Sequence, residues 1–277
     1  MNTENQALNI LVTLDANYVP YLNVMLTSLL HSNPGCRVDV YLLHSSMRER
    51  DMASTRDILA PSGRLIMIDA REAGLEGAPT TARYPKEIYY RIFAAKYLPK
   101  DLERVLYLDP DLIVNGPLKH LYEMPMPEYY FAAASHTGPF MRKMNGLRLD
   151  MKDGSPYINS GVMLMNLALL RKEQNYEDVF RFIDRRKNFL ILPDQDIISS
   201  LYGSKIFVLD PFRYNMTEWL YQLHAPFERD LDLAWVRKHS IIIHYCGRNK
   251  PWKENYRGEL DVFYRETVSR MPANGEG

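Results

Sequence analysis

The chain has 277 residues, of which 46% are hydrophobic, and its 34 basic side chains balance 34 acidic ones. These values are those of an ordinary globular protein, which excludes extended disorder, a collagen-like repeat and a long coiled coil. The balanced charge also argues against a general nucleic-acid-binding protein, which usually carries excess basic residues.

The first half of the chain alternates between strand and helix patterns. Short apolar runs predict buried strands at 8–14, 38–43, 64–68 and 105–108. Apolar residues at helical spacing predict helices at 21–30, at about 48–59 and at 88–97. Four such alternations favour βαβ units and a largely parallel sheet.

The second half is less regular. It contains apolar runs typical of strands at 131–134, 161–165, 206–209 and 241–243, and helical patterns at 177–186 and 195–201. No shift in composition marks a linker, and no internal repeat is found. The sequence therefore predicts one α/β domain, residues 1–277, with an elaborated second half.

Targeting signals are missing from the sequence. No apolar run is long enough for a membrane-spanning helix, and the polar start at 1–6 lacks the features of a secretory signal. Two cysteines, Cys36 and Cys246, are too few for a disulfide framework. These features predict a cytoplasmic protein with reduced thiols.

Ligands of open parallel sheets bind beyond the carboxyl ends of the strands, so the residues after each strand are the first candidates. No glycine-rich phosphate loop follows the first strand. The fourth strand runs into Asp109-Pro110-Asp111, whose two carboxylates point the same way if the segment is extended. Paired carboxylates suit Mg²⁺ or Mn²⁺, whereas the alternative is that they begin a turn or that Asp111 caps a helix.

A third metal ligand is offered by His244, which ends the apolar run at 241–243. It would lie at the same sheet edge as the aspartates if these strands are parallel, and imidazole with two carboxylates suits Mn²⁺. On spacing alone a hydrogen-bonded core histidine is the commoner case, and His44 has the same placement after the second strand. Lys250 suits a phosphate clamp, or is an ordinary surface lysine.

Two further segments carry polar residues with local explanations. Asp194 fits a helix N-cap, and Asp196 fits the first turn, where negative charge is favoured. Gln195 between them has no such explanation. Asn159 lies in a turn that enters a strand, where it could orient a sugar hydroxyl or bond its own backbone.

Six motifs occur in order over nearly the whole chain, from about residue 8 to 252. They are Asp15-Ala16-Asn17-Tyr18, Tyr89-Tyr90-Arg91, 105–111, 157–162, 192–196 and 244–252. Together they resemble the retaining glycosyltransferases of family eight, which include bacterial lipopolysaccharide galactosyltransferases and glycogenin.

The resemblance implies a GT-A fold, with a nucleotide-binding half at about 1–115 and an acceptor-side half at about 116–277. It implies transfer of glucose or galactose from a UDP-sugar to a glycan, glycolipid or other hydroxyl acceptor, with retention and with Mn²⁺ or Mg²⁺. By resemblance, the metal ligands are Asp109, Asp111 and His244. The uridine pocket is formed by Asp15, Asn17 and Tyr18, and the donor sugar is contacted by Arg91, Asn159, Asp194 and Gln195. The diphosphate is held by Lys250 and the backbone of Gly247.

The family pattern places Gln195, a poor nucleophile, on the ring face opposite the leaving group. We therefore hypothesise that Gln195 stabilises the cationic sugar while the acceptor attacks from the leaving-group side. Asp194 and Asp196 remain alternatives as nucleophiles or orienting groups.

The chain departs from the family pattern at Ala16 and at His136, where relatives carry acidic residues. Because His136 falls near the acceptor, the identity of the acceptor stays open. The segment 271–277 lacks the basic, aromatic tail that anchors some relatives, so we expect at most peripheral contact with a membrane.

Two other functions fit part of the sequence. Asp-x-Asp after an apolar strand is also found in metal-dependent phosphohydrolases, although Ile113 stands where those enzymes carry a hydroxyl residue. The second alternative is a non-catalytic protein that binds a sugar nucleotide. Intact Asp109, Asp111, Gln195, His244 and Lys250 argue against it.

Overall fold

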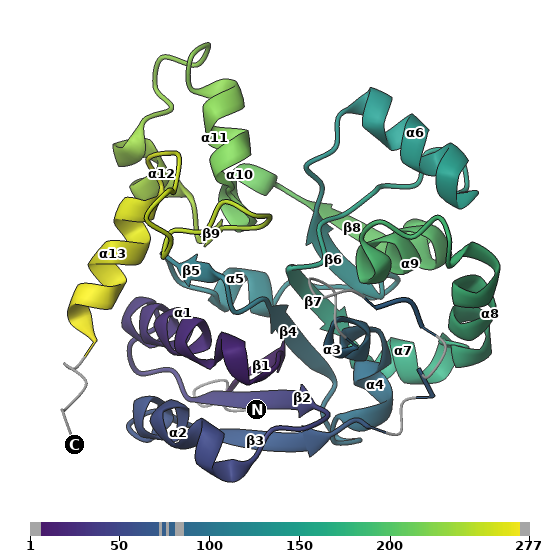
Figure 1. Ribbon diagram of the computed structural model, residues 1–277, viewed down its shortest axis with the longest axis horizontal. Coiled ribbons are helices and arrows are strands. Elements are labelled where there is room, and N and C mark those ends of the chain that lie inside the picture. Colours follow the sequence, from purple (N-terminus) through teal and green to yellow (C-terminus); the bar gives the residue numbers. More distant parts are fainter. Residues whose placement is uncertain (1–6, 72–73, 76–77, 81–85, 272–277) are drawn as a thin grey trace.

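The computed structural model of the protein describes residues 7–71, 74–75, 78–80 and 86–271. The polar start at 1–6 and nearly all of the C-terminal segment lie outside these residues. One large twisted sheet runs through the molecule, with helices on both of its faces (Figure 1).

The central sheet has seven strands in the order β3-β2-β1-β4-β7-β6-β8. Their bounds are β1 (Leu8–Thr13), β2 (Val38–His44), β3 (Gly63–Asp69), β4 (Arg104–Leu108), β6 (Phe131–Ala134), β7 (Val162–Asn166) and β8 (Ile206–Leu209). Only β7 runs against its neighbours, because it pairs antiparallel with both β4 and β6. The prediction of a mostly parallel α/β sheet is therefore confirmed.

The burial of the strands explains why the sequence shows them as continuous apolar runs. In β4, Val105 and Tyr107 pack on one face of the sheet, and Leu106 and Leu108 pack on the other, each fully buried. Successive side chains of a strand point to opposite faces, so a sheet covered by helices on both sides needs apolar residues at every position.

The helices of the first half are α1 (Val19–Ser32), α2 (Ala53–Leu59), α3 (Glu87–Tyr90) and α4 (Ala94–Tyr97), with 3-10 turns η1 (Ala16–Tyr18), η2 (Glu49–Met52) and η3 (Arg91–Phe93). Two predicted helices are therefore subdivided. The segment at about 48–59 begins as a 3-10 turn, and the segment at 88–97 consists of α3, η3 and α4.

The second half holds α5 (Lys119–Tyr122), α6 (Pro139–Leu149), α7 (Leu167–Glu173), α8 (Tyr176–Arg186), α9 (Pro193–Tyr202), η4 (Gly203–Lys205), α10 (Pro211–Tyr214), α11 (Glu218–His224), α12 (Leu233–His239) and α13 (Asp261–Arg270). The predicted helices at 177–186 and 195–201 correspond to α8 and α9. The sequence did not predict α5, α6, α7, α10, α11, α12 or α13. None of the described helices is long and apolar enough to cross a bilayer.

A second, two-stranded sheet pairs β5 (Leu112–Val114) antiparallel with β9 (Ile242–His244). The expectation that the run at 241–243 is a strand is confirmed, but the assumption of a parallel strand at the main sheet edge is wrong. The antiparallel register puts His244 opposite Leu112, one residue beyond Asp111. This pairing, rather than a shared parallel edge, brings the histidine to the aspartates.

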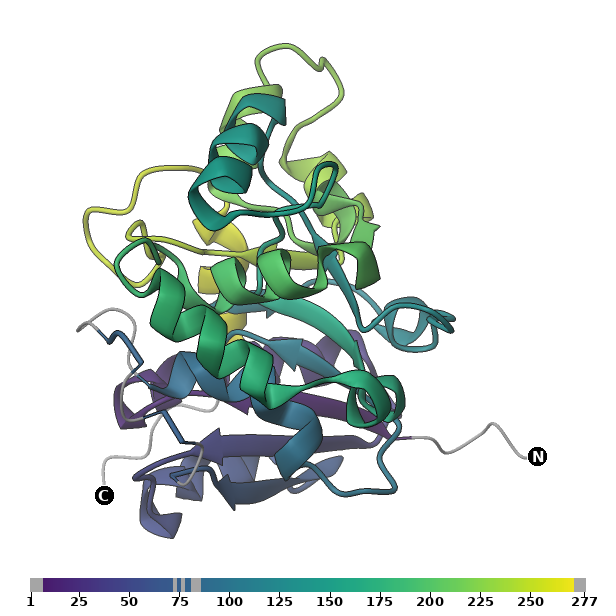
Figure 2. The same cartoon turned by 90° about the vertical axis from the view of Figure 1, so that its right-hand side faces the viewer.

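The first three strands lie at one end of the molecule and many helices of the second half at the other, although α13 packs against α1 and α7 against α4 (Figure 1). In Figure 2, β1 to β3 and α2, drawn in purple and blue, lie at one end, and the green helices of the second half lie at the other. The segments that follow β1, β4 and β9 meet between these regions, where the structure contains a cavity.

Candidate active site

The cavity has a volume of about 440 Å³ and takes its walls from both halves of the chain. Eleven of the residues expected at a site line it: Asp15, Tyr18, Arg91, Asp109, Asp111, Asn159, Asp194, Gln195, His244, Gly247 and Lys250. Asn17 and Asp196 are not among the residues that line the cavity. The cavity thus brings together side chains that lie far apart in the sequence. The first, Asp15, and the last, Lys250, are separated by 235 positions (250 − 15).

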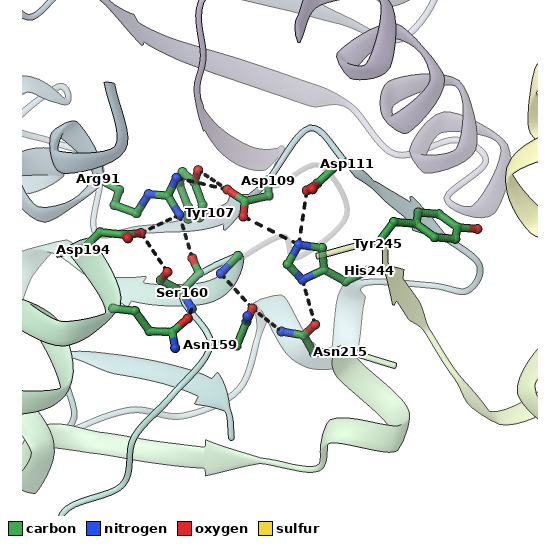
Figure 3. Close-up of polar contacts among 12 residues, drawn as sticks. Arg91, Tyr107, Asp109, Asp111, Asn159, Ser160, Asp194, Asn215, His244 and Tyr245 are labelled. Atoms are coloured by element: carbon green, nitrogen blue, oxygen red, sulfur yellow. Dashed lines mark hydrogen bonds and ion pairs between the residues drawn. The ribbon is translucent and has the colours of Figure 1, made fainter. Parts of the chain in front are cut away.

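Two carboxylates and an imidazole form a cluster at the cavity wall (Figure 3). One ligand atom each from Asp109, Asp111 and His244 lies within 4.8 Å of the others. The Nε2 atom of His244 is 3.2 Å from Oδ1 of Asp111 and 3.6 Å from Oδ2 of Asp109. This donor set, carboxylate oxygens with one imidazole nitrogen, fits Mn²⁺ or Mg²⁺ better than a softer metal.

The backbone holds the cluster in place. The amide of Asp109 donates to the carbonyl of Gly161 over 2.8 Å, and the amide of Tyr245 donates to the carbonyl of Asp111 over 3.0 Å. A Cβ atom on Gly161 would overlap both the His244 ring and the Asp109 carboxylate. A glycine is therefore needed at position 161, where the chain passes beside the cluster just before β7.

Lys250 provides the cluster with a positive charge. Its ammonium contacts Oδ2 of Asp111 and donates to the carbonyl of Tyr245 over 2.8 Å. Burial opposes ionisation of Asp111, but the Lys250 ammonium and the neighbouring His244 imidazole outweigh it and lower the pKa of this carboxyl. Burial likewise opposes the charge of Lys250, and Asp111 raises the pKa of the ammonium above its usual value. Lys250 is therefore a buried partner of Asp111, not a surface lysine.

Arg91 forms a second buried ionic network beside the first. Its guanidinium lies 3.1 Å from Oδ1 of Asp109 and 2.9 Å from Oδ2 of Asp194, and it stacks 4.1 Å above the ring centre of Tyr107. Burial opposes this charge, but Asp109, with Tyr107 and Asp194, raises the pKa of the guanidinium. The hydroxyl of Tyr107 donates to Asp109 over 2.6 Å. The arginine thus stays charged in the cavity wall.

The start of α9 differs from the sequence prediction. The helix begins at Pro193, its N-cap position is Leu192, and Asp194 is not the capping residue that was expected. Proline suits the first helical position, because it has no amide hydrogen to leave unpaired, and this shifts Asp194 into the first turn. There Asp194 accepts a hydrogen bond from the Ser160 hydroxyl over 2.7 Å.

Asp194 and Gln195 both lie on the cavity wall. Burial raises the pKa of the Asp194 carboxyl, and the Arg91 guanidinium opposes that rise. The Oε1 atom of Gln195 accepts from the Ser160 amide over 3.4 Å. Both residues are held by the same turn that precedes β7.

Asp196 is fully buried and is bonded only to protein groups. It accepts from both terminal nitrogens of Arg148 over 2.7 and 2.8 Å, from the Tyr157 hydroxyl over 2.6 Å and from the Ile191 amide over 2.7 Å. These bonds join α6, α9 and the turn before β7. Its suggested role as a nucleophile stays a prediction, and this geometry favours an anchoring role.

Sequence reasoning missed several polar residues of the site. Asn215, which is fully buried, bonds both His244 and Asn159, and no spacing or motif singles it out. Ser160 and Tyr107 lie inside quoted motifs but were not assigned a role. His136 lines the cavity and bonds the carbonyl of Asn215 over 2.8 Å, and burial lowers the pKa of its imidazole to about 4.

The mostly parallel sheet, flanked by helices, has the fold class called GT-A, as the similarity to a solved structure shows. The crystal structure of galactosyltransferase LgtC in complex with donor and acceptor sugar analogs matches with a TM-score of 0.82. That match covers 97% of this chain and 98% of the other, and at 23% identity it establishes the fold alone.

Residues 9–256 match the family described as glycosyl transferase family 8, and the chain belongs to this family. Lipopolysaccharide 1,2-glucosyltransferase of Escherichia coli K12 is 24% identical, over 90% of this chain and 73% of the relative. General stress protein A of Bacillus subtilis is 25% identical over 92% of both chains. Lipopolysaccharide 1,3-galactosyltransferase of Salmonella typhimurium is 23% identical over 95% of this chain and 78% of the relative.

Proposed function

We propose that this protein is a retaining hexosyltransferase that moves glucose or galactose from a UDP-sugar to a hydroxyl of a glycan or glycolipid, with Mn²⁺ as its cation. The observation that carries the proposal is the cluster of Asp109, Asp111 and His244 within 4.8 Å at the cavity wall. Family membership supports glycosyl transfer. The names of the glucosyltransferase and galactosyltransferase relatives support a hexose.

The cluster and Lys250 would take the diphosphate of the donor. Asp109, Asp111 and His244 would hold the divalent cation, and Lys250 already reaches this position through its contact with Asp111. Gly247 lines the cavity with a φ of 92°, a conformation that suits glycine and lets a phosphate approach the backbone. Mg²⁺ is the alternative cation, because the same oxygen ligands accept it.

The remaining donor contacts are proposed on both sides of the cluster. The uridine would lie against Asp15, Asn17 and Tyr18 at η1, where the Asp15 carboxylate accepts from the Asn17 amide over 2.9 Å. The hexose would contact Arg91, Asn159, Asp194 and Gln195. We propose about residues 1–115 as the nucleotide-binding half and about 116–277 as the acceptor-side half, with Arg91 of the first reaching the hexose and Lys250 of the second reaching the diphosphate.

Retention is proposed to occur on one face of the sugar. A divalent cation in the cluster supplies Lewis-acid stabilisation of the departing UDP. The bond between the anomeric carbon and the phosphate oxygen breaks, the acceptor oxygen bonds to the same face, and its proton passes to the departing phosphate. Gln195 would place its amide oxygen toward the cationic sugar. The competing route is attack by a carboxylate, and Asp194, tied to Arg91 and Ser160, is poorly placed to leave its ion pair.

The test is release of hexose from UDP-glucose and UDP-galactose, measured with Mn²⁺ and again with a chelator. Asp109→Asn and Asp111→Asn are expected to abolish turnover, because each removes one carboxylate from the cluster. Asp57→Asn is the matched control, since Asp57 is exposed on α2. Turnover in both cluster variants equal to that of the control would contradict the proposal.

Two further measurements separate the mechanisms and the alternatives. The anomeric configuration of the first-formed product, read by NMR, is expected to match that of the donor, and inversion would contradict retention. A trapped sugar adduct on Asp194 or Asp196 would overturn the same-face route. Phosphate release from a simple phosphomonoester would instead support the phosphohydrolase, and donor binding without turnover would support a non-catalytic binding protein.

A further inference from the structure

Asn215 lies against His244 on the side of the ring that faces away from the two carboxylates (Figure 3). It is fully buried, and its side-chain oxygen is 3.0 Å from Nδ1 of His244. Its side-chain nitrogen donates to Oδ1 of Asn159 over 2.9 Å. The next residue, Met216, exchanges backbone hydrogen bonds with β9, so Asn215 and His244 are held on one frame.

The direction of these hydrogen bonds can be assigned from one group whose polarity is fixed. The backbone amide of Gly161 can only donate, and it contacts Oδ1 of Asn159 over 3.1 Å. That atom must therefore be the carbonyl oxygen of the Asn159 side chain. The Asn215 atom that contacts the same oxygen must be a donor, which makes it the amide nitrogen.

It follows that the Asn215 oxygen faces the imidazole of His244. An amide oxygen only accepts, so Nδ1 of His244 carries a hydrogen. When the imidazole is neutral, Nε2 is then the nitrogen without a hydrogen, and it faces Asp111 and Asp109 at 3.2 and 3.6 Å. Two carboxylates and this nitrogen converge on one point, so a cation bound there would meet three acceptors, with Nδ1 holding the hydrogen of the imidazole.

We call this chain of hydrogen bonds, from the Gly161 amide through Asn159 and Asn215 to His244, the relay. Turning either asparagine amide around would break one of its hydrogen bonds. A flipped Asn215 would set its oxygen against the Asn159 oxygen, and a flipped Asn159 would set its amide group against the Gly161 amide. Asn215 is fully buried, so water cannot easily replace a partner lost by its side chain, whereas Asn159 is half-buried beside the cavity. The tautomer of His244 is therefore selected by a backbone amide two residues beyond the Asn159 side chain.

We propose that Asn215 is a positioning residue of the metal site. Together with Asn159 it transmits the polarity of the Gly161 amide to His244 and holds the ring with Nδ1 protonated and Nε2 free for the cation. This inference rests on the proposed cation site. It also gives Asn159 a role that does not depend on contact with a sugar.

The test compares two substitutions of Asn215 that differ in hydrogen-bond acceptance. Asn215→Leu has a similar size but accepts nothing, and it is expected to weaken Mn²⁺ binding by about 10- to 100-fold. Asn215→Asp still accepts from Nδ1 but cannot donate to Asn159, so it is expected to keep most of the affinity. Asn23→Leu removes a buried amide from α1, away from the cavity, and is expected to leave Mn²⁺ binding unchanged.

Binding is measured by titration calorimetry with Mn²⁺ alone, so turnover is not the readout. In parallel, long-range ¹H–¹⁵N NMR of the metal-free protein reports the tautomer, with the signals of His244 assigned by their loss in His244→Asn. Nδ1 protonation is expected in the wild type. A wild type in which Nδ1 carries no hydrogen would overturn the relay.

The outcomes separate the relay from the proposed function. Wild-type Mn²⁺ affinity in Asn215→Leu, or equal losses in the leucine and aspartate variants, would overturn the relay while leaving the transferase intact. If the wild type binds neither Mn²⁺ nor Mg²⁺, the proposed function fails, and the tautomer measurement still decides the relay. If Asn215→Leu does not fold, the aspartate variant and the tautomer decide it.

Discussion

Replacing Lys250 with methionine is expected to make the stability of this protein depend on divalent cations. Among the described residues, Asp111 forms an ion pair with Lys250 and contacts the His244 imidazole, and the residue is only 8% exposed. Methionine keeps an unbranched stem but removes the ammonium. Asp111 is then left as a buried charge without its lysine, while Arg91 remains engaged with Asp109.

The magnitude follows from the cost of removing one partner of a buried pair, about 3–5 kcal/mol. One kcal/mol shifts the melting temperature of a domain of about this size by about 2–4 °C, so Lys250→Met is expected to melt about 6–20 °C below the wild type in a chelator. Bound Mn²⁺, at a hundred times its dissociation constant, is expected to raise the free energy of unfolding of Lys250→Met by about 2.7 kcal/mol. The wild type is expected to gain less, because the cation must first displace Lys250 from Asp111.

The assay is thermal unfolding followed by circular dichroism, in EDTA and in excess Mn²⁺. The double variant Asp111→Asn with Lys250→Met is the control, because it removes both charges. We expect it to melt above the single variant in EDTA and to respond little to Mn²⁺. The reasoning is refuted if Lys250→Met melts with the wild type in EDTA, or if Mn²⁺ leaves the gap unchanged.

Three further predictions concern residues of the cavity wall or directly beside it. Asp196→Asn is expected to lower the free energy of unfolding by about 3–5 kcal/mol in urea, because it breaks a buried, bidentate ion pair; an unchanged midpoint would argue against the anchoring role. Gly161→Ala is expected to weaken Mn²⁺ binding by overlap with the cluster, whereas Gly146→Ala, which has open space around it, is the control; equal affinities would contradict the packing. The pKa of His136 falls from 6.5 to about 4 on folding, so the unfolded chain binds more protons between these values and stability falls as the pH falls from 6.5 toward 4. His136→Asn is expected to flatten this fall by about 2–3 kcal/mol between pH 7 and pH 4.5 in urea titrations, and equal slopes would contradict it.

Much of the sheet was predictable because its strands are buried on both faces. Runs such as 105–108 must be apolar at every position when helices cover both sides, and this signal is local. Helix α6 buries only Asn145 and Leu149, and α12 buries only Val236, so the apolar periodicity of these two helices is weak. The division of 88–97 into α3, η3 and α4 could not be predicted from the sequence either, since the apolar residues of all three segments have the spacing of a single helix.

The site divides in the same way. Asp109 and Asp111 were found from their position after a strand, and the family motifs supplied most of the other cavity residues. The capping role of Asp194 was wrong because Pro193 moved the helix start. Asn215 carried no signal, because a buried amide that orients a histidine through one hydrogen bond leaves no periodicity in the chain.

By itself, the order of residues determined the apolar strands, the pair of acids at the end of one of them and the family to which the chain belongs. Only the tertiary structure decided that β9 pairs antiparallel with β5, that Lys250 neutralises Asp111 and that Asn215 faces His244. The physical reason is the separation along the chain of the residues that interact. Burial and periodicity act between near neighbours in the chain, whereas hydrogen-bond direction and charge pairing depend on which distant segments meet.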